Sequence, residues 1–433
     1  MNNTPKSLRL HIGIIGRTNT GKSSFVNYIS AQDVSITSPV PGTTTDVVEK
    51  TIELAPLGPV VLLDTAGSDD NTELGSLRAA KSTAVLDRCD IVCLLVESNV
   101  WTEYEVRLVA AIQDRNLPFI IVVNKTDLNR ADEVFLHKIG EYTTDILLCS
   151  AVQPEGREAC ITALKEILIR LAPDDYFQPP PLAEDLVGPG GHAVLIVPID
   201  VGAPKGRLIL PQVQTLRSLL DAGAAGTLVK EDEYPGFLKQ LKGDPELVIC
   251  DSQVVDMMVR ETPAHIKATT FSILFARFKG DLVSAARGAG MIHRLKEGDR
   301  VLIAEACSHH PMEDDIGRVK IPAWIEDYTG LSLNWTVAAG KDYPADLESY
   351  SLIIHCGACM LNRRAMLNRV QQADSVETPM TNYGLAIATA HGVGGRVLEP
   401  FPEAHRAYTQ AMAPTDHDKN RGSSHTFADH QGA

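Results

Sequence analysis

The chain has 433 residues, of which 44% are hydrophobic and 22% charged, so its composition is that of a globular protein with about three domains. Its formal net charge of −15 disfavours broad binding to nucleic acid, because phosphates repel an acidic surface. The start of the chain lacks the apolar core of a signal peptide and no apolar run reaches the roughly 18 residues of a membrane span, so we expect a cytoplasmic protein without membrane contact.

From residue 8 to about residue 171, apolar runs alternate with segments of helical periodicity. HIGIIG (11–16), VVLLDTAG (60–67) and PFIIVVNKTD (118–127) are strand-like, and each ends in glycine or polar residues. This alternation is typical of a doubly wound, mainly parallel sheet. We therefore expect residues 1–175 to form an α/β domain.

The stretch GRTNTGKS (16–23) fits the pattern G-x-x-x-x-G-K-[S/T] and lies between a predicted strand and a predicted helix. Backbone N–H groups of such a loop and of the following helix bind phosphates, so the pattern predicts a P-loop. We expect Lys22 to reach the β- and γ-phosphates of a nucleotide and the Ser23 hydroxyl to bind Mg²⁺. The predicted phosphate-binding residues are Gly16, Asn19, Thr20, Gly21, Lys22, Ser23 and Ser24.

The segments DTAG, NKTD and SAV follow at later strand ends, in the order that a GTPase needs. Asp64 can hold Mg²⁺ through a water molecule, and the Gly67 N–H can contact the γ-phosphate. Asp127 can accept hydrogen bonds from N1–H and the 2-amino group of guanine, and adenine offers no such pair of donors, so the pattern predicts GTP. The predicted base-binding residues are Asn124, Lys125, Asp127, Ser150 and Ala151.

Residues 8–171 resemble the TrmE-Era-type translational-class GTPases, whose switch I usually reads PGTTRD where this chain has PGTTTD (41–46). The resemblance implies that Thr43 or Thr44 completes the Mg²⁺ shell. It also implies that Asn19 helps to bind a potassium ion beside the phosphates, where the ion would supply positive charge during hydrolysis.

Glu73, in the predicted switch II, is a candidate for orienting the attacking water. A solvated surface glutamate is an equally good interpretation of this residue. The residue after DTAG is Ser68 rather than the glutamine that positions water in Ras-like proteins, so we expect slow GTP hydrolysis that potassium stimulates. The predicted catalytic residues are Asn19, Lys22 and Glu73.

Proline and glycine are frequent in residues 176–191, which predicts a linker. The strand-helix alternation then resumes and predicts two further α/β domains, over residues 192–275 and 276–408. Within the first of these, IKATTFSILFARF (266–278) reads as a strand. Residues 409–433 are polar and rich in histidine, so we expect a disordered tail. The expected fold class is α/β, with three α/β domains.

Two cysteine-histidine segments, CSHH and HCGAC, end predicted parallel strands of the third domain. The carboxyl ends of parallel strands meet at one edge of a sheet, so the two segments can form one metal site. Three thiolates suit either a cubane iron-sulfur cluster with one open iron or a zinc site completed by histidine. The candidate metal ligands are Cys307, His309, His355, Cys356 and Cys359.

The other five of the eight cysteines lie in or beside apolar segments, where free cysteines usually act as small core residues. Eight cysteines in a chain of this length are too few for a disulfide framework. The predicted core cysteines are Cys89, Cys93, Cys149, Cys160 and Cys250.

A P-loop GTPase followed by C-x-H and H-C-x-x-C resembles the HydF family, the GTPase scaffold proteins of iron-iron hydrogenase maturation. The resemblance covers nearly the whole chain, including APKGRLILPQVQTLRSLLDAG (203–223). It implies that residues 192–275 form a dimerisation domain and that residues 276–408 bind a [4Fe-4S] cluster. The implied cluster ligands are Cys307, Cys356 and Cys359, with His309 and His355 nearby and at most weakly bound.

The same resemblance implies what the protein would do. It implies a homodimer that carries a transient di-iron precursor of the hydrogenase H-cluster and delivers it to the apo-hydrogenase. Two radical-SAM maturases would be the other partners. A cluster held by three cysteines suits this role, because its fourth iron can bind an exchangeable ligand.

Two other functions remain open. A GTPase of tRNA modification or ribosome assembly with a C-terminal zinc module would share the first domain, but it should carry a basic surface for RNA. An enzyme that uses C-x-x-C as a redox dithiol would leave Cys307 and the two histidines without a role. Iron content distinguishes a cluster protein from both of these.

Overall fold

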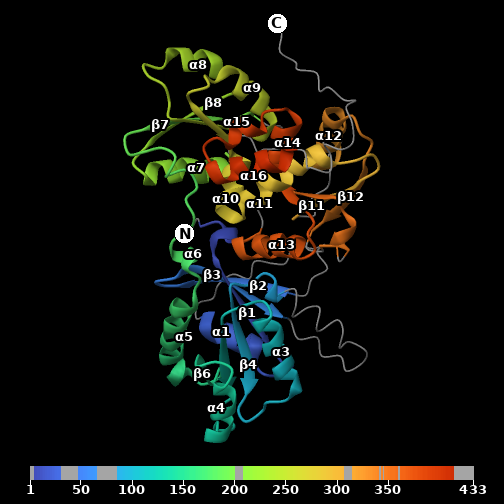
Figure 1. The fold of residues 1–433 in the computed structure, drawn as a ribbon. Coiled ribbons are helices and arrows are strands. Elements are labelled where there is room, and N and C mark those ends of the chain that lie inside the picture. Colours follow the sequence, from blue (N-terminus) through green and yellow to red (C-terminus); the bar gives the residue numbers. More distant parts are fainter. Residues whose placement is uncertain are drawn as a thin grey trace. The chain divides into compact units, whose positions relative to one another are not determined.

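The chain folds into α/β structure with mostly parallel sheets, as the sequence predicts (Figure 1). The computed structural model describes residues 4–30, 47–65, 85–199, 208–306, 315–340, 343–344, 346–358 and 361–413. The chain divides into two compact units, Met1–Pro180 with Cys359–Asn368, and Pro181–Ala358 with Arg369–Ala433. The first unit contains one sheet and the second contains two. The predicted domain boundaries stay a prediction.

The sheet of the first unit has six strands in the order β2-β3-β1-β4-β5-β6. They are β1 (Leu10–Gly16), β2 (Val47–Leu54), β3 (Gly58–Thr65), β4 (Ile91–Glu97), β5 (Phe119–Asn124) and β6 (Ile146–Leu148). Only β2 pairs in the antiparallel sense, with β3. Strand β1 lies between β3 and β4, so the loop that follows it leaves the carboxyl edge near the middle of the sheet.

Helices cover both faces of this sheet, which makes it doubly wound. They are α1 (Lys22–Ser30), α3 (Glu103–Gln113), α4 (Glu133–Gly140), α5 (Arg157–Leu171) and the short α6 (Asp174–Phe177), with 3-10 turns at Lys6–Leu8 and Pro154–Gly156. Phe25 of α1 and Leu164 of α5 belong to the apolar core on one face. Ile112 of α3 and Ile139 of α4 belong to the core on the other. The strands between the two cores are almost completely buried, as in other parallel sheets.

The second unit begins with a four-stranded parallel sheet in the order β10-β9-β7-β8. Its strands are β7 (His192–Ile196), β8 (Ala225–Val229), β9 (Leu247–Cys250) and β10 (Lys267–Thr270). Its helices are α7 (Leu210–Asp221), α8 (Tyr234–Gln240), α9 (Val255–Glu261) and α10 (Phe271–Lys279), with a 3-10 turn at Ser252–Val254. The predicted strand at 266–278 is wrong beyond Thr270, because the Thr270 hydroxyl caps α10 by accepting the Ile273 N–H at 3.2 Å.

The other sheet of the second unit is also parallel and has the order β12-β11-β13-β14. Its strands are β11 (Arg300–Glu305), β12 (Asn334–Ala339), β13 (Leu352–His355) and β14 (Met380–Asn382). The helices are α11 (Leu282–Gly290), α12 (Ile321–Thr329), α13 (Arg363–Ser375), α14 (Tyr383–Ala390), α15 (Gly394–Leu398) and α16 (Pro402–Met412). Two 3-10 turns lie at Met291–Arg294 and Leu347–Ser349, and a π-helical turn lies at Ile316–Lys320. Helices α11 and α16 pack closely, since a Cβ on Gly290 would lie 2.6 Å from the Ala411 Cβ.

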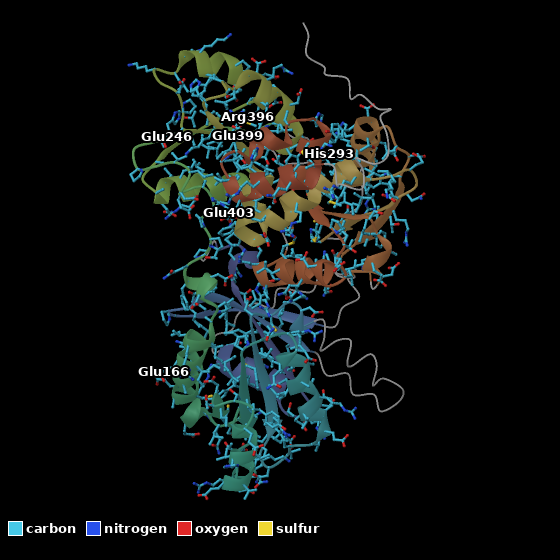
Figure 2. The ribbon with its side chains drawn as sticks, in the orientation of Figure 1. Glu166, Glu246, His293, Arg396, Glu399 and Glu403 are labelled. Atoms are coloured by element: carbon cyan, nitrogen blue, oxygen red, sulfur yellow. The ribbon has the colours of Figure 1, made fainter. Side chains whose placement is uncertain are left out.

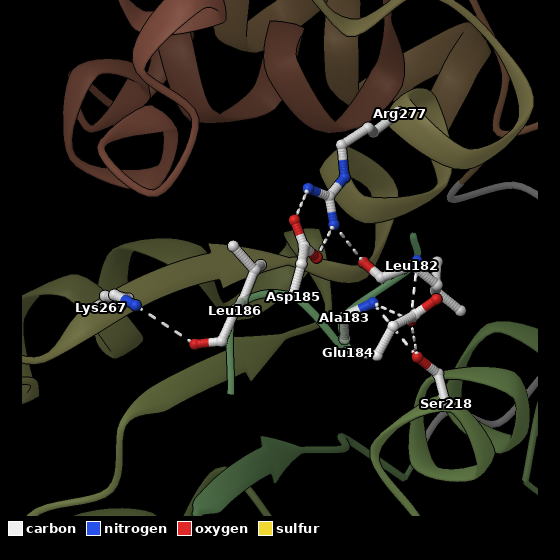
Figure 3. Close-up of polar contacts among 8 residues, drawn as sticks. All are labelled: Leu182, Ala183, Glu184, Asp185, Leu186, Ser218, Lys267 and Arg277. Carbon is white, nitrogen blue, oxygen red and sulfur yellow. Dashed lines mark hydrogen bonds and ion pairs between the residues drawn. The ribbon is translucent and has the colours of Figure 1, made fainter. Parts of the chain in front are cut away.

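Residues 182–187, predicted as part of a linker, are instead packed into the second unit (Figure 3). Arg277 of α10 forms an ion pair with Asp185 at 2.7 Å and donates to the Leu182 carbonyl at 2.9 Å. Lys267 of β10 donates to the Leu186 carbonyl at 3.2 Å, and Glu184 accepts from Ser218 of α7. Side chains of this segment are buried in the core. The sequence did not indicate this, because the segment lies between proline-rich stretches that predict a linker.

One apolar core extends through both sheets of the second unit. Arg396 of α15 links the helices of the second sheet to the first sheet, because it donates to the Pro263 carbonyl, just before β10, at 3.2 Å. Its guanidinium also pairs with Glu399 at 2.5 Å (Figure 2). None of the described helices is long and apolar enough to cross a membrane.

Candidate nucleotide and metal sites

The loop after β1 has the backbone of a P-loop, and two of its glycines are structurally required. Gly16 and Gly21 have φ of 148° and 88°. A Cβ on Gly16 would lie 2.3 Å from the Leu95 carbonyl oxygen, and one on Gly21 would lie 2.4 Å from Asn124 Nδ2. Asn19 is exposed and also has a positive φ of 66°. The loop therefore packs tightly against β4 and β5 while it turns toward α1.

Lys22 bends back over this loop. Its Nζ donates to the carbonyl oxygens of Gly16 at 3.0 Å and Arg17 at 2.8 Å, and the residue is 8% exposed. Thr20, also buried, donates from Oγ1 to the Arg17 carbonyl at 2.9 Å. The ammonium group is thus held inside the curve of the loop, where phosphate oxygens would replace these carbonyls.

Ser23 and Asp64 form the part of the site that suits a magnesium ion. The Ser23 hydroxyl donates to Asp64 Oδ2 at 3.1 Å. Asp64 is only 7% exposed, and its Oδ1 has no hydrogen-bond partner among the described residues. Burial raises the pKa of Asp64, although Ser23 and Lys22 oppose the shift. A buried, unsatisfied carboxylate oxygen beside a hydroxyl matches the hard oxygen ligands that Mg²⁺ prefers, so these residues fit the ion.

Asn124 joins the P-loop to the base-binding loops. Its Nδ2 donates to the Thr20 carbonyl at 2.8 Å, and its Oδ1 accepts the Ala151 N–H at 3.1 Å. Asp127 Oδ1 accepts the Ser150 hydroxyl at 2.7 Å, which orients the carboxylate. The residues predicted to bind guanine therefore lie together at the ends of β5 and β6.

Further residues that the sequence analysis did not select support this site. Lys125 has a φ of 60° and pairs with Glu97 at 2.6 Å, while Thr126 Oγ1 donates to the Cys149 carbonyl at 3.0 Å. Arg17 forms an ion pair with Glu105 at 3.0 Å. The helix-capping pattern T-x-x-E beginning at Thr102 was readable in the sequence, but its contact with the P-loop was not.

Several predicted nucleotide residues lie outside the described part of the chain, and nothing in the structure tests them. Ser24 is described and exposed on the first turn of α1. The predicted residues outside the described ranges are Thr43, Thr44, Gly67 and Glu73.

Strand β11, which precedes CSHH in the chain, and β13, which ends at His355 of HCGAC, are neighbours in the sheet. Ala304 of β11 is in register with His355 of β13, and the Cys356 N–H donates to the Ala304 carbonyl at 2.9 Å. The Ala306 N–H points to Cys356 Sγ at 3.1 Å, and Ala306 directly precedes Cys307 in the chain. An N–H directed at sulfur stabilises a thiolate, so this sheet edge fits a thiolate-bound metal.

The remaining predicted ligands Cys307, His309 and Cys359 lie outside the described residues. Within the described ranges, no group of three or more histidine, cysteine, aspartate or glutamate residues is placed to hold a metal ion. Cys356 is the single cysteine of the six described that is not buried. The five predicted core cysteines are buried, as expected, and burial raises the pKa of the Cys93 thiol to about 12.

His355 is placed differently from a metal ligand. Its Nδ1 lies 2.7 Å from the Cys356 carbonyl oxygen, and its Nε2 lies 2.8 Å from Arg369 Nη1. The carbonyl requires a proton on Nδ1, so Nε2 accepts from Arg369 and no lone pair is left for a metal. Burial, followed by the Arg369 charge, lowers the pKa of His355 to about 3. This arrangement favours a supporting role for His355 in place of the predicted ligand role.

Comparisons with known protein families match three parts of the chain. Residues 11–125 match the family described as 50S ribosome-binding GTPase. Residues 182–280 match the hydrogen maturase F dimerization domain, and residues 283–400 match the hydrogen maturase F tetramerization domain. The first match and the P-loop geometry together identify a P-loop GTPase domain in the first unit.

Curated relatives are similar to the GTPase part alone. The tRNA modification GTPase MnmE of Synechococcus sp. (strain JA-3-3Ab) is 36% identical over 166 residues, which cover 37% of this chain and 34% of the relative. The MnmE of Caldicellulosiruptor saccharolyticus is 33% identical over 162 residues, covering 36% of this chain and 34% of the relative. The chain thus spans about a third of the length of these relatives.

Solved structures give weaker similarities. The G domain of the T. maritima FeoB iron transporter has a TM-score of 0.29 and 22% identity, covering 38% of this chain and 98% of its own. Aquifex aeolicus Era has a TM-score of 0.30 and 17% identity, covering 54% of this chain and 98% of its own.

Proposed function

The chain belongs to the hydrogen maturase F family, and we propose that it is a GTP-hydrolysing scaffold that carries a [4Fe-4S] cluster and a di-iron precursor for hydrogenase maturation. The observation that carries the proposal is the contact between the Ala306 N–H and Cys356 Sγ, because Ala306 directly precedes the predicted ligand Cys307 in the chain. A GTPase domain in the same chain supports a nucleotide-dependent step of the maturation process.

GTP would bind across the carboxyl edge of the first sheet. Lys22 would exchange its loop carbonyls for phosphate oxygens, and Ser23 with Asp64 would hold Mg²⁺. Asp127, oriented by Ser150, would accept two hydrogen bonds from guanine. Mg²⁺ would neutralise charge that develops on the phosphates. Asn19 would contribute to a potassium site beside the phosphates. From the switches, Thr43 or Thr44 would complete the Mg²⁺ shell, the Gly67 N–H would contact the γ-phosphate, and Glu73 would orient the attacking water.

The cluster would be held by Cys307, Cys356 and Cys359, and the fourth iron would supply an exchangeable position for the precursor. Within this site His355 would orient the Cys356 backbone through the 2.7 Å contact of Nδ1 with the carbonyl. His309 would lie close to the cluster. The di-iron precursor would be cargo for delivery to the apo-hydrogenase, with two radical-SAM maturases as the other partners.

A homodimer is part of the proposal. The matched family domains are named for dimerization and tetramerization, which supports self-association. Along α7 and its cap, Ile209, Val213 and Leu220 are 39%, 47% and 58% exposed. The spacing of seven residues puts Val213 and Leu220 on one face of α7, with Ile209 at its N-cap, and burial of this face against a second copy would stabilise the assembly. A Leu220→Glu variant that keeps the wild-type mass in light scattering would exclude this face.

Anaerobic reconstitution with iron and sulfide tests the proposed function. We expect about four irons per wild-type chain and a brown protein, both lost in Cys356→Ser. Cys250→Ala is the matched control, because Cys250 is a buried cysteine of the same unit and should leave the iron content unchanged. A colourless protein with stoichiometric zinc would overturn the proposal and favour the tRNA-modification alternative.

A further inference from the structure

Arg369 of α13 is a buried cation whose described contacts are all with neutral groups. It is 8% exposed. Its Nη1 donates to His355 Nε2 at 2.8 Å, its Nη2 donates to the Gly340 carbonyl at 3.0 Å, and its guanidinium lies over the Tyr343 ring at 5.1 Å. No carboxylate pairs with it in the described part of the chain.

A guanidinium remains charged at any physiological pH, and burying it without an anion is strongly unfavourable. At the end of β11, by contrast, the partly exposed Arg318 pairs with the buried Glu305 at 2.6 Å. Arg369 is more deeply buried than Arg318, and no carboxylate among the described residues pairs with it. An anion that binds next to it would therefore meet a charge already in place.

The turn that carries Cys356 consists of residues 356–358, directly after β13. A second buried cation contacts the end of this turn. Lys279, the last residue of α10, is 2% exposed, and its Nζ donates to the Ala358 carbonyl at 3.4 Å. Ala358 has a φ of 50°, an unusual conformation for a residue with a side chain. Arg369 acts on the start of the turn through His355, and Lys279 acts on its end. The two cations thus fix the backbone on both sides of Cys356.

The Cys356 thiol is one of two acidic side chains whose electrostatic interaction reaches Arg369. The other is the Tyr343 phenol, whose pKa is raised by burial, so that it stays neutral and leaves Cys356 as the group that can carry the anion. A cubane cluster with a 2+ core and three thiolates carries a net charge of about −1, which becomes about −2 on reduction. Such an anion at Cys356 would satisfy Arg369.

We propose that Arg369, assisted by Lys279, is the counter-charge of the thiolate-bound cluster at Cys356, and that its bond to His355 positions the ligand-bearing turn. The inference rests on the proposed function, since it needs a cluster at Cys356. It assigns to this pair of cations the stabilisation of the reduced, more negative cluster. In the sequence Arg369 is one of three arginines of α13, and nothing distinguished it from Arg363 and Arg364.

The test measures the midpoint potential of the cluster in the full, anaerobically reconstituted chain by EPR-monitored redox titration. Arg369→Gln keeps a hydrogen-bond donor and removes the charge, so the midpoint should become more negative than in the wild type. Arg369→Lys keeps the charge and should restore most of the shift. The exposed Arg287→Gln on α11 is the matched control and should leave the midpoint unchanged.

Each outcome decides the question. A full cluster with an unchanged midpoint in Arg369→Gln overturns the inference and leaves the proposed function standing. A wild-type chain that binds no cluster overturns the proposed function and the inference with it. If Arg369→Gln fails to fold by circular dichroism, Lys279→Gln carries the same prediction of a more negative midpoint, and an unchanged value there overturns the inference.

Discussion

The carboxylate of Glu105 on α3 forms a two-pronged ion pair with Arg17 of the P-loop. Arg17 Nε lies 3.1 Å from Oε1 and Nη2 lies 3.0 Å from Oε2. Glu105 is 2% exposed and also accepts the Thr102 N–H at 2.8 Å. Burial alone would raise the pKa of Glu105, but the bonds from Arg17 and Thr102 hold it below its usual value. The first turn of α3 therefore holds the loop whose carbonyls receive Lys22.

We predict that Glu105→Gln weakens GDP and GTP binding about five- to tenfold, because one charge-assisted hydrogen bond contributes roughly 1–1.4 kcal/mol here. Isothermal titration measures the loss. Arg17→Met should cause a similar loss, and the double variant should add little to either. Glu103→Gln is the control, since Glu103 is an exposed glutamate of the same turn that pairs with Arg107. Fully additive losses would show that Glu105 and Arg17 affect nucleotide binding independently and not through their ion pair.

Asp127 is predicted to determine which base binds. Asp127→Asn replaces an acceptor with a donor, so the site should lose GTP and gain xanthosine triphosphate, whose 2-position carries an oxygen acceptor. We expect affinity for GTP to fall at least a hundredfold, measured by competition with a fluorescent nucleotide. Ser150→Ala removes the 2.7 Å bond to Asp127 and should weaken both nucleotides without changing the preference. An unchanged preference in Asp127→Asn would show that another residue recognises the base.

The parts of the fold and site that were predictable are those with short-range sequence signals. The strand-helix alternation and the P-loop residues are local, and the structure has an α/β fold with Lys22, Ser23, Asp64 and Asp127 at one sheet edge. The Arg369 contacts were not predictable, because they join residues 340, 355 and 369 through the order of strands in the sheet. The helix at Phe271–Lys279 was also missed, since its buried apolar face gives a continuous apolar run that resembles a strand.

His11 and Asp90 are predicted to give opposite pH dependences to the stability of the first unit. The backbone N–H of His11 donates to Asp90 Oδ2 at 2.7 Å. Burial raises the pKa of Asp90 to about 7, and burial lowers the pKa of His11 to about 4. Between pH 4 and 6.5 the folded chain keeps a proton on Asp90 that the unfolded chain releases, so stability falls as pH rises. Over the same range the unfolded chain protonates His11 and the folded chain does not, so stability rises with pH.

The two effects should nearly cancel in the wild type, and Asp90→Asn removes one of them. Relative to the wild type, the free energy of unfolding of Asp90→Asn should therefore increase by about 1 kcal/mol per pH unit between pH 4.5 and 6.5. Urea denaturation followed by Trp101 fluorescence, with Trp324 and Trp335 changed to phenylalanine, reports on this unit. His11→Gln should show the opposite trend. Parallel pH curves for wild type and Asp90→Asn would contradict the assignment.

Cys149 and Cys160 form a pair of thiols whose sulfur atoms lie 3.5 Å apart beneath the base-binding loop. The Cys149 carbonyl accepts the Thr126 N–H at 3.3 Å and the Thr126 hydroxyl at 3.0 Å, and Ser150 follows directly. A disulfide needs an S–S distance of about 2.05 Å, so closing it would pull the loop toward α5.

We predict that diamide oxidises this pair to an intramolecular disulfide: each thiol gives up one electron and one proton, and diamide is reduced to its hydrazine. Affinity for GDP should fall several-fold because the loop that carries Ser150 and Ala151 shifts, and dithiothreitol should restore it. Cys160→Ala should abolish the response, whereas Cys93→Ala, a buried cysteine of β4, should keep it. Mass spectrometry identifies the linked peptides. A disulfide that forms without any change in GDP affinity would show that the base-binding loop tolerates the contraction.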